Sequence, residues 1–122
     1  MTNKILVVED EQGLAELLEY FLGELGYDVI TAYNGHVALQ MLQRRPVELI
    51  ISDLMMPVKD GYEFVKELKA FPILATIPIM LASGGPISPT RLNPYKAEAY
   101  LAKPFDLHEL ELLVYRLFDI RV

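Results

Sequence analysis

Cysteine is absent from this sequence of 122 residues. Its absence excludes disulfide scaffolds, cysteine-ligated zinc sites and thiol nucleophiles. Long apolar runs are absent too: none reaches the roughly 20 residues of a membrane-spanning helix, so no insertion into a membrane is expected. The first residues lead straight into a strand-like run and show no signal peptide, which predicts a cytoplasmic protein.

Basic side chains are fewer than acidic ones in this sequence. Lysine and arginine total 11 against 17 aspartates and glutamates, a formal net charge of −6. Because sequence-independent binding to nucleic acid depends on basic side chains that meet phosphates, we expect no direct nucleic-acid partner. Hydrophobic residues make up 52% of the chain, enough to bury a core, and the composition does not shift along it. Residues 1–122 are therefore expected to form a single domain.

Short apolar runs alternate with helical patterns along the chain. A stripe of apolar residues between Leu14 and Leu25, at helical spacing, predicts a first helix that stops at Gly26. Three more helices are predicted after Asn34, over residues 62–70 and from Asp106. The expected strands are residues 5–8, 28–32, 49–52, 78–82 and 99–102.

Strands that alternate with helices build a parallel sheet covered on both faces. We therefore predict a flavodoxin-like, doubly wound α/β fold with five parallel strands in the order 2-1-3-4-5. Residues 83–95 contain three prolines and two glycines, which leave no room for an ordinary amphipathic helix. The helix between strands 4 and 5 is predicted to be short or missing, with at most a turn around residues 90–93 in a mostly irregular, mobile segment.

Polar residues stand at the carboxyl ends of four predicted strands: Glu9 and Asp10, Asp53, Ser83 and Lys103. In this fold those ends lie side by side, at the edge where ligands bind. Like charges about 4 Å apart repel by about 4 kcal/mol at an effective dielectric constant of about 20. The cluster is therefore expected to hold a divalent cation, and oxygen-only ligands favour Mg²⁺. A carboxylate beside Mg²⁺ and an ammonium group can attack a phosphoryl group and form an acyl phosphate.

Four segments of the chain resemble the receiver domain of two-component response regulators: residues 7–11, 53–61, 78–83 and 100–105. The resemblance covers nearly the whole chain, with the motifs in the family's order and spacing. It implies that Asp53 is the phosphoacceptor and that a sensor histidine kinase or a phosphotransfer protein phosphorylates it. It also implies a signalling switch rather than an enzyme, a protein that catalyses only its own phosphoryl transfer and dephosphorylation.

The resemblance assigns roles around Asp53. Glu9 and Asp10 would hold Mg²⁺ together with Asp53 and the backbone carbonyl of Met55. Lys103 would contact the phosphoryl group, and its bond to the following proline would be cis.

The resemblance also implies a switch pair. The Ser83 hydroxyl would move toward the phosphoryl group while the Tyr100 ring swings inward to fill the space behind it. Receivers usually carry a full helix between strands 4 and 5, on the surface that contacts output partners. Because that helix is replaced here, we expect phosphorylation to order residues 84–96.

The motifs also allow other interpretations. The acidic run 9–11 alone is more typical of a helix N-terminus than of a metal site. The same run lacks the glycine spacing of a dinucleotide-binding loop. A phosphatase of the haloacid dehalogenase type needs a second aspartate two residues after the first, where this chain has Met55.

Two alternatives stay open. The chain could be a pseudo-receiver that signals by contact alone, and it could be either a stand-alone regulator or part of a longer chain.

Overall fold

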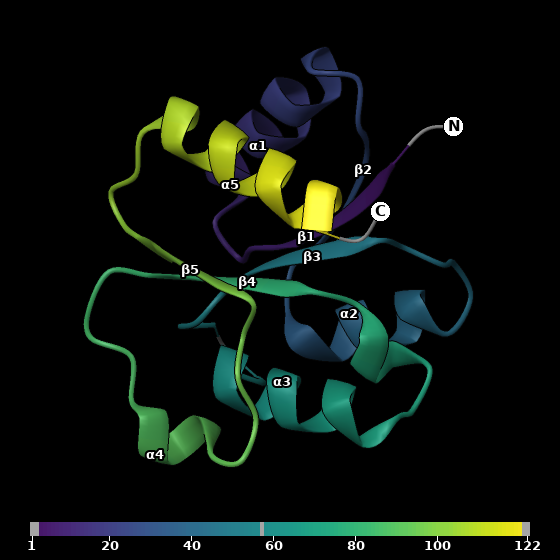
Figure 1. Ribbon diagram of the computed structural model, residues 1–122, viewed down its shortest axis with the longest axis vertical. Helices are drawn as coiled ribbons and strands as arrows, with labels where there is room; N and C mark the ends of the chain where they lie inside the picture. Colours follow the sequence, from purple (N-terminus) through teal and green to yellow (C-terminus); the bar gives the residue numbers. More distant parts are fainter. Residues whose placement is uncertain (1–2, 57, 121–122) are drawn as a thin grey trace.

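A parallel five-stranded sheet with helices on both faces forms the centre of the molecule (Figure 1). The computed structural model describes residues 3–56 and 58–120. The strands are β1 (Lys4–Val8), β2 (Asp28–Ala32), β3 (Leu49–Asp53), β4 (Ile79–Ser83) and β5 (Ala99–Ala102). They lie side by side in the order β2-β1-β3-β4-β5, and every pair is parallel. The predicted flavodoxin-like fold is confirmed.

The helices form two layers on the sheet. On one face lie α1 (Gln12–Glu24) and α5 (Leu107–Ile120), and on the other α2 (Gly35–Leu42), α3 (Gly61–Ala70), the 3₁₀ turn η1 (Leu74–Thr76) and the short α4 (Pro89–Leu92). Within the described residues, no helix has both the length and the apolar character needed to cross a bilayer.

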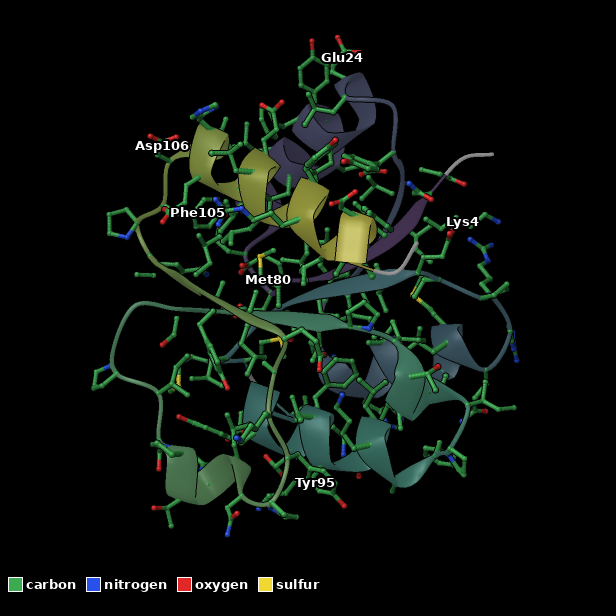
Figure 2. The ribbon with its side chains drawn as sticks, in the orientation of Figure 1. Lys4, Glu24, Met80, Tyr95, Phe105 and Asp106 are labelled. Atoms are coloured by element: carbon green, nitrogen blue, oxygen red, sulfur yellow. The ribbon has the colours of Figure 1, made fainter. Side chains whose placement is uncertain are left out.

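Two apolar cores, one on each face, explain why the strand runs show no polar alternation. Successive side chains of a strand point to opposite faces. Leu6 and Val8 therefore pack with α2 and α3, whereas Ile5 and Val7 pack with α1 and α5. Met80 belongs to the second core and is fully buried between the sheet and α5 (Figure 2). A sheet covered on both sides requires apolar residues at nearly every strand position.

Helix α1 follows its predicted stripe with two exceptions. Leu18 and Leu22 are buried, and Gly26 ends the helix region at a φ of 100°, which glycine adopts readily. Leu17 and Leu25, which the stripe placed on the buried face, are 46% and 39% exposed. Leu25 is the C-cap residue and lies beyond the last residue of α1.

Helix α3 begins one residue earlier than predicted, because a capping box forms at the expected turn. The Asp60 carboxylate accepts the Glu63 N–H at 3.0 Å, and the Glu63 carboxylate accepts the Asp60 N–H at 3.3 Å. Gly61 donates its N–H to the Leu54 carbonyl at 2.7 Å. A Cβ at position 61 would lie 2.8 Å from the Leu54 Cα, so only glycine fits there.

The segment between β4 and β5 is largely irregular, as its prolines and glycines predicted. Helix α4 has four residues, and the predicted turn at 90–93 overlaps it with an offset of one position. Leu92 is 3% exposed and belongs to the α2/α3 core. The expected mobility of the segment stays a prediction.

Candidate functional site

The polar strand-end residues meet at one edge of the sheet, as the topology requires. Asp53 pairs with Ala82 and Ser83 pairs with Ala102 in the parallel register. Asp53 and Ser83 are the last residues of β3 and β4, rather than the first residues after them, which corrects the predicted strand ends by one position.

Glu9, Asp10 and Asp53 form an acidic cluster. Each offers a carboxylate oxygen, and these oxygens all lie within 4.8 Å of one another. Glu9 and Asp53 are 3% and 8% exposed, whereas Asp10 is exposed to solvent. Clustered carboxylate oxygens with no nitrogen or sulfur donor, open to water on one side, fit a hard cation that keeps part of its hydration shell. The residues present therefore fit Mg²⁺.

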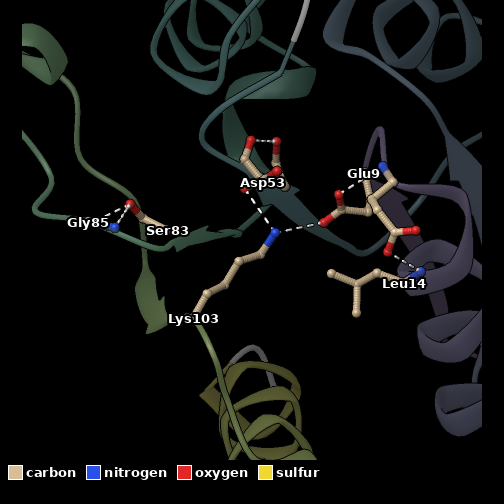
Figure 3. Close-up of polar contacts among 8 residues, drawn as sticks. Glu9, Leu14, Asp53, Ser83, Gly85 and Lys103 are labelled. Atoms are coloured by element: carbon tan, nitrogen blue, oxygen red, sulfur yellow. Dashed lines mark hydrogen bonds and ion pairs between the residues drawn. The ribbon is translucent and has the colours of Figure 1, made fainter.

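Lys103 joins the two buried carboxylates (Figure 3). Its Nζ lies 3.0 Å from Oε1 of Glu9 and 3.2 Å from Oδ1 of Asp53. The peptide bond from Lys103 to Pro104 is cis, as the family resemblance implied. Three carboxylates and one ammonium group leave a formal charge of −2 in the cluster, which favours a divalent cation.

Burial and the opposite charges nearby shift the pKa values of both Glu9 and Lys103 in opposite directions. Burial raises the pKa of the Glu9 carboxyl, although the Glu11 N–H and the Lys103 ammonium partly offset the effect. Burial alone lowers the pKa of Lys103, but the hydrogen bond to Glu9 and the charge of Asp53 outweigh it, so the pKa of Lys103 is raised. The lysine therefore stays protonated at neutral pH and keeps a positive charge beside Asp53.

The three acidic residues 9–11 have two different roles, in the acidic cluster and at the start of α1, and the sequence alone did not show which residue has which. Glu11 caps α1, because its carboxylate accepts the N–H groups of Gly13 and Leu14 at 2.9 and 2.8 Å. Its own N–H donates to Oε2 of Glu9 at 3.1 Å, which helps to orient the Glu9 side chain. Asp10 stands between them with its carboxylate in the cluster.

The Met55 backbone carbonyl, implied as a metal ligand, lies in the loop between β3 and α3, two residues after Asp53. The Met55 side chain is 67% exposed, so it lies in solvent and not in the core. Val58 in the same loop is 81% exposed and has a φ of 69°, which a β-branched residue adopts only under strain. No sequence signal indicated this strain.

The hydroxyl groups of the two switch residues are hydrogen-bonded to nearby backbone groups and not to the acidic cluster. The Ser83 hydroxyl donates to the Gly85 carbonyl at 2.7 Å and accepts the Gly85 N–H at 3.2 Å, so it is turned toward its own loop (Figure 3). Tyr100 is 46% exposed, and its hydroxyl accepts the Ala97 N–H at 3.3 Å. A residue of this type in a strand is more typical of a core, but β5 is an edge strand and leaves the ring in solvent.

Comparison with known proteins places this geometry in a family. Residues 5–115 match the model of the response regulator receiver domain. The alkaline phosphatase synthesis transcriptional regulatory protein PhoP of Bacillus subtilis is 36% identical over 114 residues, which cover 93% of this chain and 48% of PhoP. The chain spans about half the length of the curated relatives it matches.

Solved structures agree with the sequence match. The receiver domain of a signal transduction histidine kinase from Syntrophus aciditrophicus superposes with a TM-score of 0.89 at 36% identity, covering 97% of this chain and 91% of that chain. The response regulator TrrA of Thermotoga maritima, solved in complex with Mg²⁺ and BeF, gives a TM-score of 0.84 at 33% identity, covering 95% and 99% of the two chains. The chain belongs to the response regulator receiver domain family.

Proposed function

We propose that this chain is a phosphoacceptor in a two-component system and that Asp53 receives the phosphoryl group. The observation that carries the proposal is the shared ammonium of Lys103, which lies within 3.2 Å of Asp53 and 3.0 Å of Glu9 inside an acidic cluster. Family membership supports it, because receiver domains act as signalling switches. The donor would be a phosphohistidine of a sensor histidine kinase or of a phosphotransfer protein.

The chemistry uses the buried Asp53 carboxylate as a nucleophile. One of its oxygens attacks phosphorus, a P–O bond forms, and the bond from phosphorus to the donor's leaving group breaks. Lys103 is placed to contact an oxygen of the transferred group, where its charge offsets the negative charge that gathers on that group. Slow attack of water on the acyl phosphate would return the chain to its starting state.

Glu9, Asp10, Asp53 and the Met55 carbonyl are proposed to hold Mg²⁺. When bound, Mg²⁺ would supply positive charge to the phosphoryl oxygens during transfer. The cluster suits such an ion because its carboxylate oxygens converge within 4.8 Å. The Mg²⁺ in the TrrA structure lends support from a relative.

Ser83 and Tyr100 are proposed to convert phosphorylation into a surface change. The Ser83 hydroxyl would leave Gly85 for an oxygen of the phosphoryl group, and the exposed Tyr100 ring would turn inward. A separate output protein or domain, in the cytoplasm, would bind the altered surface. PhoP, one relative, is named a transcriptional regulatory protein.

The test is incubation of the protein with acetyl phosphate and Mg²⁺, followed by intact mass measurement. We expect a gain of one phosphoryl group in the unmodified chain and none after D53N. Asp28→Asn, at the amino end of β2 on the opposite edge of the sheet, is the matched control and should still gain the mass. A gain that survives D53N contradicts the assignment, and no gain in the unmodified chain favours a pseudo-receiver.

A further inference from the structure

The segment between β4 and β5 is fastened to the first turn of α3 (Figure 1). The Ser88 N–H donates to the Tyr62 hydroxyl at 2.7 Å, and Tyr62 is 5% exposed. The Arg91 guanidinium lies 4.1 Å from the centre of the Tyr62 ring and donates to Oδ2 of Asp60 at 2.8 Å. The Arg91 side chain is therefore held both by stacking on the Tyr62 ring and by a charge-assisted hydrogen bond to Asp60.

The first turn of α3 packs against the carboxyl end of β3, where Asp53 is the last residue. Gly61 is bonded through its N–H to the Leu54 carbonyl, and a Cβ there would lie 3.0 Å from the Asp53 carbonyl oxygen. The capping box of Asp60 and Glu63 closes the turn further. The first turn of α3 is therefore a rigid support, placed directly beside Asp53.

At the other end of the same segment lies Ser83. Its hydroxyl both donates to and accepts from Gly85, so two hydrogen bonds must break before it can turn toward Asp53. Gly85 is only three positions before Ser88, which Tyr62 holds in place. A support that fixes Ser88 therefore also limits how far Gly85 can move from the Ser83 hydroxyl.

We propose that Asp60, Tyr62 and Arg91 form an anchor that keeps the Ser83 hydroxyl bound to Gly85 in the unphosphorylated chain. The three side chains are positioning residues, and the inference rests on the proposed function because it concerns the movement of Ser83 on phosphorylation. Loosening the anchor lowers the free-energy difference between the two orientations of Ser83. A ligand that selects the phosphorylated-like state then binds more tightly.

Two substitutions loosen the anchor without emptying the core. Tyr62→Phe removes only the hydroxyl that accepts the Ser88 N–H, and Arg91→Met removes the charge but keeps most of the side-chain length. Tyr115→Phe and Arg116→Met repeat the same chemical changes on exposed positions of α5 and serve as matched controls. Thermal unfolding of all four variants verifies that each one folds.

The first measurement is hydrogen exchange of the metal-free protein, which needs no phosphoryl chemistry. Amides in residues 84–92 should exchange about 2- to 10-fold faster in Y62F and R91M, the range that the loss of one hydrogen bond supports. The controls should match the unmodified chain. Unchanged exchange in both anchor variants would overturn the anchor, whatever the function of Asp53.

The second measurement is the affinity for beryllofluoride with Mg²⁺, titrated calorimetrically. The anchor variants should bind about 2- to 10-fold more tightly than the unmodified chain. In a Ser83→Ala background the same substitutions should leave the affinity unchanged, an outcome that a merely structural role does not predict. Faster exchange with equal or weaker affinity would overturn the link to Ser83. If the unmodified chain does not bind beryllofluoride, the proposed function fails, while the exchange data still decide whether the anchor exists.

Discussion

Lys103 Nζ lies 3.0 Å from Oε1 of Glu9, a buried carboxylate 94 positions earlier in the chain. The same ammonium group lies 3.2 Å from Asp53, so a single cation compensates both buried acids. The pocket therefore depends on Lys103 for its stability as well as for its proposed chemistry.

Replacing this lysine should destabilise the fold. Lys103→Met leaves Glu9 and Asp53 buried beside each other without the ammonium group. We expect the free energy of unfolding to fall by about 1–3 kcal/mol without metal, because buried charges that lose their partner are costly. Mg²⁺ should reduce the difference, since it would supply the missing positive charge. Urea unfolding measures both values, with K66M on the exposed side of α3 as the control; equal losses in the two variants would contradict the prediction.

The acidic run 9–11 offers a matched pair for the metal site. Asp10→Asn removes a carboxylate charge from the cluster, whereas Glu11→Gln alters the helix cap next to it. We expect Mg²⁺ to bind at least about 10-fold more weakly to D10N, because a full charge is lost close to the ion, and nearly normally to E11Q. Titration of Mg²⁺ followed by NMR checks this expectation, which a comparable loss in both variants would refute.

Two glycines should respond in opposite ways to alanine. At Gly61 the added Cβ meets the Leu54 backbone at 2.8 Å, so we expect a loss of about 1–3 kcal/mol. At Gly23, in the last turn of α1, nothing lies within 4 Å of the added Cβ. G23A should gain about 0.5–1 kcal/mol, because glycine is costly in a helix. Thermal or urea unfolding of the pair measures both effects, and a neutral G61A would disprove the close approach.

The Asp60 carboxyl should make the stability depend on acid pH. Burial alone raises its pKa, but the N–H of Glu63 and the Arg91 guanidinium outweigh burial and lower it. A group with a lowered pKa in the folded state contributes its full stability above its unfolded pKa of about 3.9 and loses it as the pH falls through the folded value.

Asp60→Asn keeps a good N-cap but loses the charge that pairs with Arg91. We expect the free energy of unfolding of D60N to be about 0.5–1 kcal/mol lower at pH 7 than that of the unmodified chain. Below about pH 4 it should change less steeply with pH. Urea unfolding at a series of pH values measures the profile, with the exposed Asp119→Asn as the control. A profile for D60N as steep as that of the unmodified chain would argue against this role.

Phosphorylation should order residues 84–96. Gly84 and Gly85 are exposed, and nothing lies within 4 Å of a Cβ added at either one, so this stretch can settle into a second conformation. We expect amide exchange across 84–96 to slow when beryllofluoride and Mg²⁺ are added, except at Gly85, whose N–H would lose the Ser83 hydroxyl as its acceptor. D53N should show no such change, and unchanged exchange in the unmodified chain would count against the prediction.

The fold was predictable because its signals are local. Apolar runs such as residues 49–52 are long enough for one strand, and a stripe such as Leu18 and Leu22 marks a buried helix face. Prolines and glycines marked the shortened α4. Element ends shifted by one residue, at Asp53 and Ser83, because hydrogen bonds to neighbouring strands set where a strand stops.

The sequence by itself determined the topology and the residues at the strand ends, since chain order and periodicity fix both once a parallel sheet forms. Only the tertiary structure decided how those residues are oriented. It turned Glu9 inward and left Glu11 as a helix cap, bonded Ser83 to Gly85, and brought Arg91 to Asp60 across 31 positions. Such contacts depend on packing between distant segments, and no local pattern encodes the distance between two side chains that meet only after folding.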